Sequence, residues 1–226
     1  MRPIIRGDHP KNAHTGDPIT ITNYSHARPE LLNRIGDYCS YCENQITNPA
    51  VEHIQPIVEA PFVETNWYNF LIACKSCNSR KGSKYLDLDS YYWPDIHNTH
   101  HLFEMHSGGI VRIKTNLHFS VDLQRVQNTM SLVGLDAYGS QTTDADRRWI
   151  KRMEAWNKAN QSLCYYSKFD YDPDYILSII NIATSTGFWS VWMKVFENHY
   201  PVQEELIKAF DGTLEDCLSS DINRFP

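Results

Sequence analysis

Two pairs of cysteines constrain the fold of this chain more than any other feature of its sequence. Each pair has the spacing C-x-x-C, and 31 residues separate the first pair from the second. Zinc prefers four thiolate or imidazole ligands in a tetrahedron, and two such pairs supply them while the intervening segment folds outward as a loop, strands and a helix. The expected ligands are Cys39, Cys42, Cys74 and Cys77. A closed four-sulfur site has no open position for a substrate, so this zinc is expected to stabilise the fold and not to catalyse.

The remaining cysteines and the apolar pattern favour a cytoplasmic protein. Four of the six cysteines are grouped in the two pairs, which in a reducing compartment indicates metal ligation and not disulfides. We expect the other two, Cys164 and Cys217, to be buried apolar residues. No stretch approaches the roughly 20 apolar residues of a membrane span, and the first residues lack the apolar segment of a signal peptide. We therefore expect a globular protein that does not bind a membrane.

The charge of the chain is unevenly distributed. The formal net charge is −6, yet residues 1–84 carry nine Lys/Arg against eight Asp/Glu, whereas residues 85–226 carry twelve against nineteen. The basic side chains of the cysteine-bounded segment are Lys75, Arg80, Lys81 and Lys84. Because so small a patch neutralises few phosphates, we expect weak, salt-sensitive binding of nucleic acid by the isolated chain.

Hydrophobic periodicity predicts a mainly helical second half. Residues 1–28, rich in Pro, Gly, His and Thr, are expected to form an extended arm, and the stretch RPELLNRIGDY a short helix. Two β-prone runs around Ser107-Gly108-Gly109 predict a hairpin. Apolar residues at helical spacing predict helices over Leu123–Val133, Asp144–Ala159, Asp174–Ala183, Phe188–His199 and Val202–Phe210.

Two of these predicted helices carry aromatic stripes. In the second, residues at i, i+4 and i+7 are Trp149, Met153 and Trp156. In the fourth, one face carries Trp189, Trp192, Met193 and Phe196. Apolar faces of this kind pack toward a core, so we expect both stripes to be buried.

A group of histidines is a second candidate metal site. The segment DIHNTHHLFEMH contains His97, His100, His101 and His106. Histidine-rich tracts can bind metal ions. However, the predicted hairpin would put alternate side chains on opposite faces, and no carboxylate or cysteine spacing accompanies the histidines, which favours structural roles.

The residues between the cysteine pairs resemble the HNH endonuclease pattern. This pattern combines an acid–His pair on a strand, a middle Asn, and a C-x-x-C-N-x-x-K stretch that opens a helix. In this sequence these are the pair Glu52-His53, then Asn69, then the stretch from Cys74 to Lys81. The resemblance covers residues 39–84 and implies a ββα-metal finger. The expected fold class is therefore α+β, in which this finger is stapled by the four-cysteine zinc site and followed by a β-hairpin and a mainly helical C-terminal half.

The resemblance also implies roles for the site residues. His53 matches the general base that activates water, and the near-neutral pKa of histidine suits that role. Glu52 and Asn78 match the protein ligands of a hard cation, Mg²⁺ or Mn²⁺. Asn69 matches the residue that holds the loop and orients the histidine. The residues expected to contact nucleic-acid phosphates are Arg80, Lys81 and Lys84. Many relatives have Asp in place of Glu52, and the longer side chain can shift the metal position.

These roles have structural alternatives. His53 could be a buried core histidine, and Asn78 could cap the N-terminus of the helix. Adjacent side chains of a β-strand point to opposite faces, so Glu52 and His53 can face one site only where the strand twists or bulges.

Features along the whole length of the chain are similar to the HNH subunits, called PtuB, of Septu-type and retron-associated anti-phage defence systems. These features include the RPI start, the first cysteine pair in C-x-Y-C-E, the segment VEHIQP and the motif GFWSVW. The resemblance implies an ABC/SMC-like ATPase partner of the PtuA type, and in the retron case also a reverse transcriptase with its nucleic acid. The acidic second half suits docking on such a partner.

The sequence thus predicts an N-terminal arm over residues 1–30, an HNH nuclease domain over 31–90, and a mainly helical region over 91–226 that docks on a partner. The predicted function is metal-dependent hydrolysis of phosphodiester bonds in DNA by the effector nuclease of a defence complex. Two alternatives stay open: a stand-alone restriction or homing-type HNH nuclease, and a non-catalytic zinc-stabilised module that binds nucleic acid or a partner. RNA also stays open as a substrate, although nothing resembles a pair of stacking aromatics on a sheet.

Overall fold

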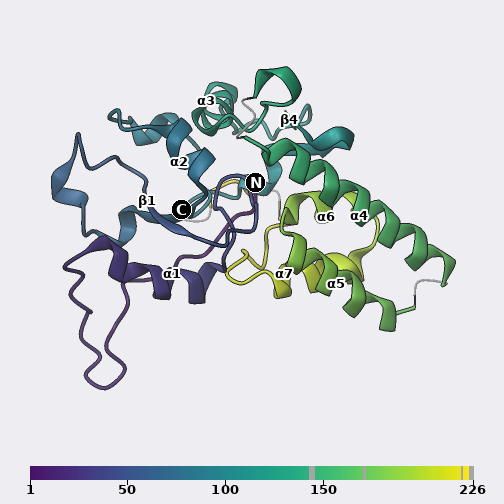
Figure 1. Ribbon diagram of the computed structural model, residues 1–226, viewed down its shortest axis with the longest axis horizontal. Helices are drawn as coiled ribbons and strands as arrows, with labels where there is room; N and C mark the ends of the chain where they lie inside the picture. The colour runs from purple at the N-terminus through teal and green to yellow at the C-terminus, as the bar shows by residue number, and fades with distance from the viewer. Residues whose placement is uncertain (143–145, 170–171, 220, 224–226) are drawn as a thin grey trace.

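The chain folds as an α+β structure in which a small ββα unit lies beside a group of packed helices (Figure 1). The computed structural model describes residues 1–142, 146–169, 172–219 and 221–223. Buried apolar side chains from the first residue to residue 222 form one cluster, so the ββα unit and the helices share a core. Within the described residues, no helix combines the length and the apolar character needed to cross a lipid bilayer.

The ββα unit, residues 39–84, has the topology that the resemblance implies, and we call it the finger. Strand β1 (Ala50–His53) pairs antiparallel with strand β2 (Phe70–Ala73), and helix α2 (Lys75–Lys81) follows directly. Every residue of β2 is buried, as expected for a short continuous apolar run. The finger therefore presents a small two-stranded sheet next to one short helix.

The other helices are α1 (Arg28–Ile35), α3 (Leu123–Val133), α4 (Arg148–Lys168), α5 (Asp174–Thr186), α6 (Trp189–Val195) and α7 (Tyr200–Ala209). Each predicted helical segment overlaps one of them, and α3 has the predicted bounds. Helices α4 and α5 end beyond the predicted last residues, Ala159 and Ala183, and α7 begins before the predicted Val202. Residues 144 and 145, the first of the helix predicted over Asp144–Ala159, lie outside the described residues. Helix α4 packs against α5 and α6, and α5 packs against α7, on the side away from the finger (Figure 1).

The predicted hairpin is confirmed. Strand β3 (Phe103–His106) pairs antiparallel with β4 (Ile110–Ile113) across a turn that contains Gly108 and Gly109. Both glycines have left-handed φ angles, 74° and 73°, which other residues adopt only with strain. A Cβ added to Gly109 would collide with the carbonyl oxygen of Trp149. Helix α4 therefore packs directly on this turn.

The aromatic stripe of α6 is buried as predicted, whereas that of α4 is only half-buried. Three residues of α6, Trp189, Trp192 and Met193, are fully buried. Phe196, which lies just beyond the end of the helix, is fully buried as well. The buried face of α4 consists instead of Arg148, Arg152, Ala155, Ala159, Ser162 and Tyr166, and its edge carries Trp149, Met153 and Trp156. The arginines turn inward because they meet buried acceptors; Arg152, for example, donates to the carbonyl oxygens of Gly109 and Leu135.

The expectation for the two separate cysteines is right for one and wrong for the other. Cys217 is buried, but Cys164 is exposed. The buried face of α4 passes through Ser162 and Tyr166, which places Cys164 on the side of the helix that faces solvent.

The start of the N-terminal segment is anchored in the core and is not a free arm. Met1 and Ile4 are buried. The guanidinium group of Arg2 donates to the carbonyl oxygens of Ile35 and Phe210, at 2.6 Å and 3.1 Å. These contacts tie the first residues to the ends of α1 and α7.

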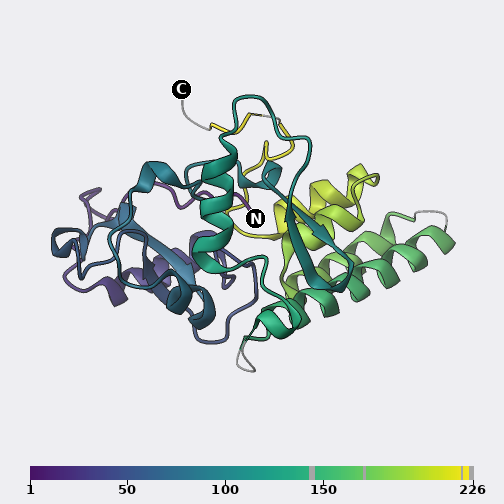
Figure 2. The ribbon, with the colours of Figure 1, turned by 90° about the horizontal axis from the view of Figure 1, so that it is seen from above.

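The helical half is fastened to the finger at the first cysteine pair. Glu43, directly after Cys42, is buried, and its carboxylate accepts hydrogen bonds from the backbone N and the Oγ of Ser190 at 2.7 Å and 2.6 Å. Its backbone oxygen accepts from the N of Phe188 at 2.9 Å. On the other side, α3 packs against α2, and Figure 2 shows α3 between the finger and α4. The helical half thus supports the finger from two directions.

A substitution at Gly187 tests the contact between the start of α6 and the turn that carries the first cysteine pair. The φ of Gly187 is 75°, and an added Cβ would lie 2.8 Å from the carbonyl oxygen of Glu43 and 2.9 Å from the N of Gln45. We expect Gly187→Ala to lower the free energy of unfolding by about 3 kcal/mol, the upper range for a strained backbone. The matched control is Gly16→Ala, where φ is 76° but nothing lies within 4 Å of the added Cβ, and we expect a loss of about 1 kcal/mol. Urea unfolding followed by tryptophan fluorescence measures both; equal losses would contradict the close contact.

Candidate active site and metal centre

The four predicted zinc ligands gather at one point. Cys39 and Cys42 lie in the turn before β1, Cys74 directly precedes α2, and Cys77 lies in its first turn. Their sulfur atoms all lie within 4.8 Å of one another, and those of Cys42 and Cys74 are 3.7 Å apart. Sulfurs at about 2.3 Å from a tetrahedral zinc ion would be roughly 3.8 Å apart. The buried cluster therefore fits a metal ion held by four thiolates.

The histidine-rich segment does not form a second metal site. Among the described residues, the four cysteines are the one group of three or more candidate ligands. The Nε2 of His101 lies 2.9 Å from the carbonyl oxygen of Cys217, and the Nδ1 of His97 accepts from the N of Trp93 at 3.0 Å. These contacts support the structural roles that the sequence favours.

An arginine from the helical half contacts the sulfur cluster. The Nη1 of Arg148 donates to the Sγ of Cys77 at 3.1 Å, and both groups are buried. Asp146 holds the same guanidinium through its Nε and Nη2, each at 2.8 Å. Burial raises the pKa of the Cys77 thiol, so a thiolate at this position depends on compensating positive charge. No motif singles out Arg148, but Arg148 and Arg152 lie one turn apart on a stripe of small residues, which is a signal for a buried helix face.

Three of the four predicted catalytic residues meet at a second place in the finger. Glu52, His53 and Asn78 line one cavity of about 160 Å³ together with Lys81, whereas the fourth, Asn69, does not line it. Glu52 and His53 come from the end of β1, and Asn78 and Lys81 from α2. The register of β1 and β2 is continuous through His53, without a bulge. The pair reaches one cavity because His53 is the last residue of its strand, where the backbone is free to turn.

Glu52 and Lys81 form a buried ion pair. The Nζ of Lys81 lies 2.9 Å from the Oε1 of Glu52, and each side chain is 2% exposed. Burial raises the pKa of Glu52, and the charge of Lys81 acts in the opposite direction. A buried carboxylate is costly unless a cation compensates it. Lys81 therefore favours the ionised form of Glu52, the form that can bind a metal ion.

The residues expected to contact phosphates lie in different environments. Lys84 is exposed to solvent. Arg80 is also exposed, but its Nε donates to the Oδ2 of Asp146 at 3.2 Å. Lys81 is buried and does not belong to the surface patch that the sequence suggests, because the buried carboxylate of Glu52 attracts its ammonium group.

His53 is half-buried and fixed by the backbone of the loop between the strands. Its Nε2 lies 2.9 Å from the carbonyl oxygen of Glu64; a carbonyl only accepts, so Nε2 carries the hydrogen and Nδ1 keeps its lone pair. The ring meets those of Tyr24 and Phe70 edge-on, with centroid distances of 4.9 Å and 5.2 Å. Burial lowers the pKa of His53, which favours the neutral imidazole near pH 7. The ring of His53 is half-buried and borders a cavity. His53 is therefore not the fully buried core histidine that the sequence leaves open as an alternative role.

Asn69 holds the loop that follows β1. Its Oδ1 accepts from the N of Gln55 at 2.7 Å, and its Nδ2 donates to the carbonyl oxygen of Gln55 at 3.0 Å. The Gln55 side chain in turn exchanges two hydrogen bonds with the backbone of Leu86, at 2.7 Å and 2.9 Å. Among the hydrogen bonds of the described residues, the one that orients the His53 ring runs from its Nε2 to the carbonyl oxygen of Glu64 and does not involve Asn69. Gln55, two residues after His53 in VEHIQP, is a positioning residue that no motif singles out.

Asn78 lies in the middle of α2 and borders the cavity with an exposed side chain. The N-cap position of α2 is Cys74, so the alternative role of Asn78 as the helix N-cap is wrong. Asn78 and Glu52 line the same cavity, and their side chains carry hard oxygen donors. These two residues therefore fit the coordination of a divalent cation.

The segment that matches a known protein family contains all the residues that line this cavity. Residues 39–84 match the family described as HNH endonuclease. The finger is the part of the chain that is similar to this family. Over 57 residues the chain is also 37% identical to the Septu protein PtuB of Bacillus thuringiensis. This similarity covers 24% of the chain and 22% of PtuB, so the chain matches less than a quarter of that relative. The family match thus covers the HNH finger and no other part of the chain.

The contact between Arg148 and the sulfur of Cys77 predicts that Arg148 strengthens metal binding at the four-cysteine site of the HNH finger. We expect Arg148→Met to lower the affinity of the four-cysteine site for its metal ion by about 10- to 100-fold, the usual effect of removing a group that supports a ligand. The matched control is Arg152→Met, one turn along α4, because Arg152 is equally buried but donates to backbone oxygens and not to sulfur. Titration with a chelator and a colorimetric metal indicator measures the affinity. Identical chelator midpoints for both variants and the wild type would contradict the role of Arg148.

Proposed function

We propose that this chain is a cytoplasmic, metal-dependent endonuclease that hydrolyses phosphodiester bonds of DNA. The observation that carries the proposal is the cavity of the HNH finger, where a carboxylate, a histidine and a carboxamide meet. Hydrolysis of a phosphodiester requires a base to activate water and a cation to compensate negative charge on the phosphate and the leaving oxygen. The cavity offers one candidate base and two oxygen ligands for such a cation.

Zinc is the ion that we assign to the four cysteines. Thiolate ligands select soft or borderline metal ions, and a closed tetrahedral site with four sulfurs is typical of structural zinc. The ion would join the turn before β1 to the start of α2, with all four positions occupied by protein. Its role is to hold the HNH finger together.

His53 serves as the general base in this mechanism. Its Nδ1 accepts a proton from the attacking water while the water oxygen bonds to phosphorus. The bond from phosphorus to the leaving oxygen breaks, and that oxygen takes a proton from solvent. The carbonyl oxygen of Glu64 accepts from Nε2 at 2.9 Å, which orients the ring and stabilises the imidazolium that forms. Asn69 supports this arrangement by fixing the loop that begins after His53.

Glu52 and Asn78 are the proposed ligands of the catalytic cation, Mg²⁺ or Mn²⁺. When bound, such a cation supplies positive charge to the phosphate oxygens. Lys81 keeps Glu52 ionised and in place before the cation binds. Arg80 and Lys84 are exposed and flank the cavity-lining residues 81–83 in the sequence, and they contact phosphates of the DNA. Lys81 acts through Glu52 and not on a phosphate.

The chain is further proposed to act in an anti-phage defence complex. The similarity to the Septu protein PtuB supports this assignment. The acidic character of residues 85–226, with twelve Lys/Arg against nineteen Asp/Glu, suits docking on a protein partner. The expected partner is an ABC/SMC-like ATPase of the PtuA type, accompanied in a retron system by a reverse transcriptase and its nucleic acid. In this arrangement residues 91–226 dock on the partner while residues 31–90 cut DNA.

The role of His53 is tested by plasmid cleavage with Mg²⁺ or Mn²⁺, in the presence and absence of the ATPase partner. We expect His53→Ala to reduce the rate by about 10²- to 10⁴-fold, the usual contribution of a general base. The control is His118→Ala, which removes an exposed histidine that contacts Ser120 and lies outside the cavity, and it should cleave like the wild type. Equal cleavage by His53→Ala would remove the assignment of the base. A wild-type protein that binds DNA or its partner but never cleaves with any divalent metal would be a binding module.

The ion pair of Glu52 predicts a thermal response to the catalytic cation. Lys81→Met leaves the buried carboxylate without its ammonium partner, so we expect a loss of about 3–5 kcal/mol in the free energy of unfolding without Mg²⁺. A cation bound at Glu52 compensates the same charge, so Mg²⁺ should raise the Tm of this variant more than that of the wild type. Lys84→Met, at an exposed position, should respond like the wild type. Differential scanning fluorimetry in zinc-replete buffer measures the response; an equal Mg²⁺ effect in all three proteins would place the cation elsewhere.

A further inference from the structure

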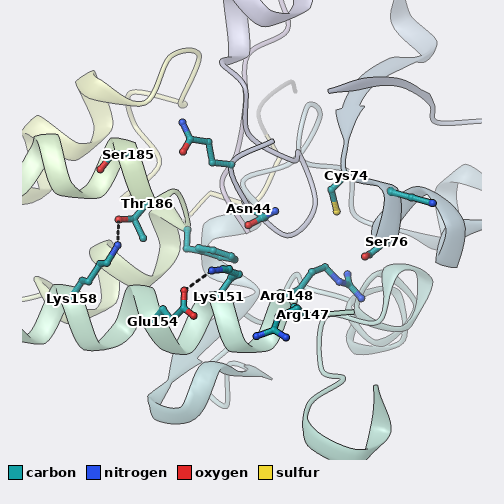
Figure 3. Close-up of a pocket in the computed structure, with 13 residues that line it drawn as sticks. Asn44, Cys74, Ser76, Arg147, Arg148, Lys151, Glu154, Lys158, Ser185 and Thr186 are labelled. Atoms are coloured by element: carbon teal, nitrogen blue, oxygen red, sulfur yellow. Dashed lines mark hydrogen bonds and ion pairs between the residues drawn. The ribbon is translucent and has the colours of Figure 1, made fainter. Parts of the chain in front are cut away.

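A second cavity, of about 510 Å³, is lined by residues from the start of α2, the first half of α4 and the end of α5, and by Cys74 of the sulfur cluster (Figure 3). Its exposed cations are Lys75, Arg147, Lys151 and Lys158, and we call it the cationic cleft. Among the described residues that line it, the one acidic side chain is Glu154, whose Oε2 lies 2.8 Å from the Nζ of Lys151. The cleft therefore carries an excess of positive charge.

This positive charge is gathered within a half of the chain that is acidic as a whole. Six of the twelve Lys/Arg of residues 85–226 lie between Arg147 and Lys168, and Glu154 is the one acidic residue of that segment. Two of the six, Arg148 and Arg152, are buried in structural contacts. The others remain on the exposed side of α4. Cations concentrated in a hollow attract a polyanion, whereas the surrounding acidic surface repels it.

The uncharged groups of the cleft also suit a phosphate backbone. Hydroxyl and amide side chains on its walls belong to Asn44, Gln45, Ser76, Ser185 and Thr186. The Nζ of Lys158 lies 3.5 Å from the Oγ1 of Thr186, so a cation and a hydroxyl group meet between α4 and α5 (Figure 3). Lysine, arginine, hydroxyl and amide groups are the side chains that contact phosphate and sugar oxygens at protein–DNA interfaces.

Helix α2 connects the cationic cleft to the catalytic cavity. A third hollow, of about 360 Å³, shares Asn78 with the catalytic cavity and Lys75 with the cationic cleft. Ser79 and Asn48 also line it. The three hollows therefore follow one another along the exposed side of α2.

The distances involved allow one DNA molecule to occupy this path. The seven residues of α2 span about 10 Å, which is the length of about three base-pair steps at 3.4 Å each. A duplex cut at the catalytic cavity therefore reaches the cleft within one helical turn of about 34 Å. We propose that the cationic cleft binds the sugar–phosphate backbone of the DNA that the HNH finger cuts, a few base pairs from the scissile phosphate. The identity of the polyanion as DNA rests on the nuclease function proposed above.

The test compares two double variants that remove equal charge. The variant Lys151→Gln/Lys158→Gln removes two lysines from the cleft: Lys151, which is ion-paired with Glu154, and Lys158. Lys168→Gln/Lys208→Gln removes an exposed lysine from the end of α4 and the ion-paired Lys208 from α7. The affinity of the zinc-loaded protein for fluorescent duplex DNA is measured by anisotropy over a series of NaCl concentrations, without added Mg²⁺ or Mn²⁺ so that no cleavage occurs.

We expect the cleft variant to bind about tenfold more weakly at low salt. The slope of log affinity against log salt should fall by about 0.9 for each phosphate that the variant no longer neutralises. The second variant should keep the wild-type affinity and slope. In cleavage assays the cleft variant should raise KM with kcat unchanged, because it leaves Glu52, His53 and Asn78 intact.

Two results would overturn the cleft as a DNA site. One is an affinity and a salt slope of the cleft variant equal to those of the control variant. The other is a wild-type protein without salt-dependent binding of DNA. Failure of the nuclease function gives a different result: the wild type never cleaves with any divalent metal, while the cleft variant still binds DNA more weakly and with a smaller salt slope, which supports the cleft and overturns only the nuclease.

Discussion

Four thiol groups from two turns that are distant in the sequence lie within 4.8 Å of one another in the protein interior. Burial raises the pKa of the Cys77 thiol, so thiolates at this position require a metal ion and nearby donors. One turn leads into β1 and the other opens α2. The sulfur cluster therefore fixes the strand that carries Glu52 and His53 relative to the helix that carries Asn78, and the cavity that these residues line depends on it.

The helical half contacts the same sulfur cluster. Helix α4 directs Arg148 toward the sulfur of Cys77 on its buried face, and its exposed face carries Lys151 and Lys158 of the cationic cleft. The carboxylate of Glu43, directly after the first cysteine pair, accepts two hydrogen bonds from the start of α6. One helix thus contacts the sulfur cluster on one face and carries on the other the cations that we propose bind DNA.

The sequence predicts best where the constraint is local. The cysteine spacing predicts the sulfur cluster, the HNH resemblance implies the finger, the glycines predict the β3–β4 turn, and periodicity predicts the bounds of α3. Prediction fails where a side chain responds to a distant group. Lys81 is buried because Glu52 is buried, and Arg148 is buried because it reaches a sulfur atom 71 residues away in the sequence. The inward turn of the α4 arginines also leaves Cys164 exposed and the tryptophan stripe half-buried, which the apolar pattern alone could not indicate.

Anomalous diffraction from crystals of the His53→Ala protein soaked in Mn²⁺ tests most directly whether a soft and a hard metal ion occupy the two ends of the finger. Data at the zinc and manganese edges should show zinc at the four cysteines and manganese between the carboxylate of Glu52 and the amide oxygen of Asn78. Zinc at the cysteines with no manganese at the cavity, and with Glu52 still paired to Lys81, would contradict the nuclease mechanism and leave only a metal-stabilised fold.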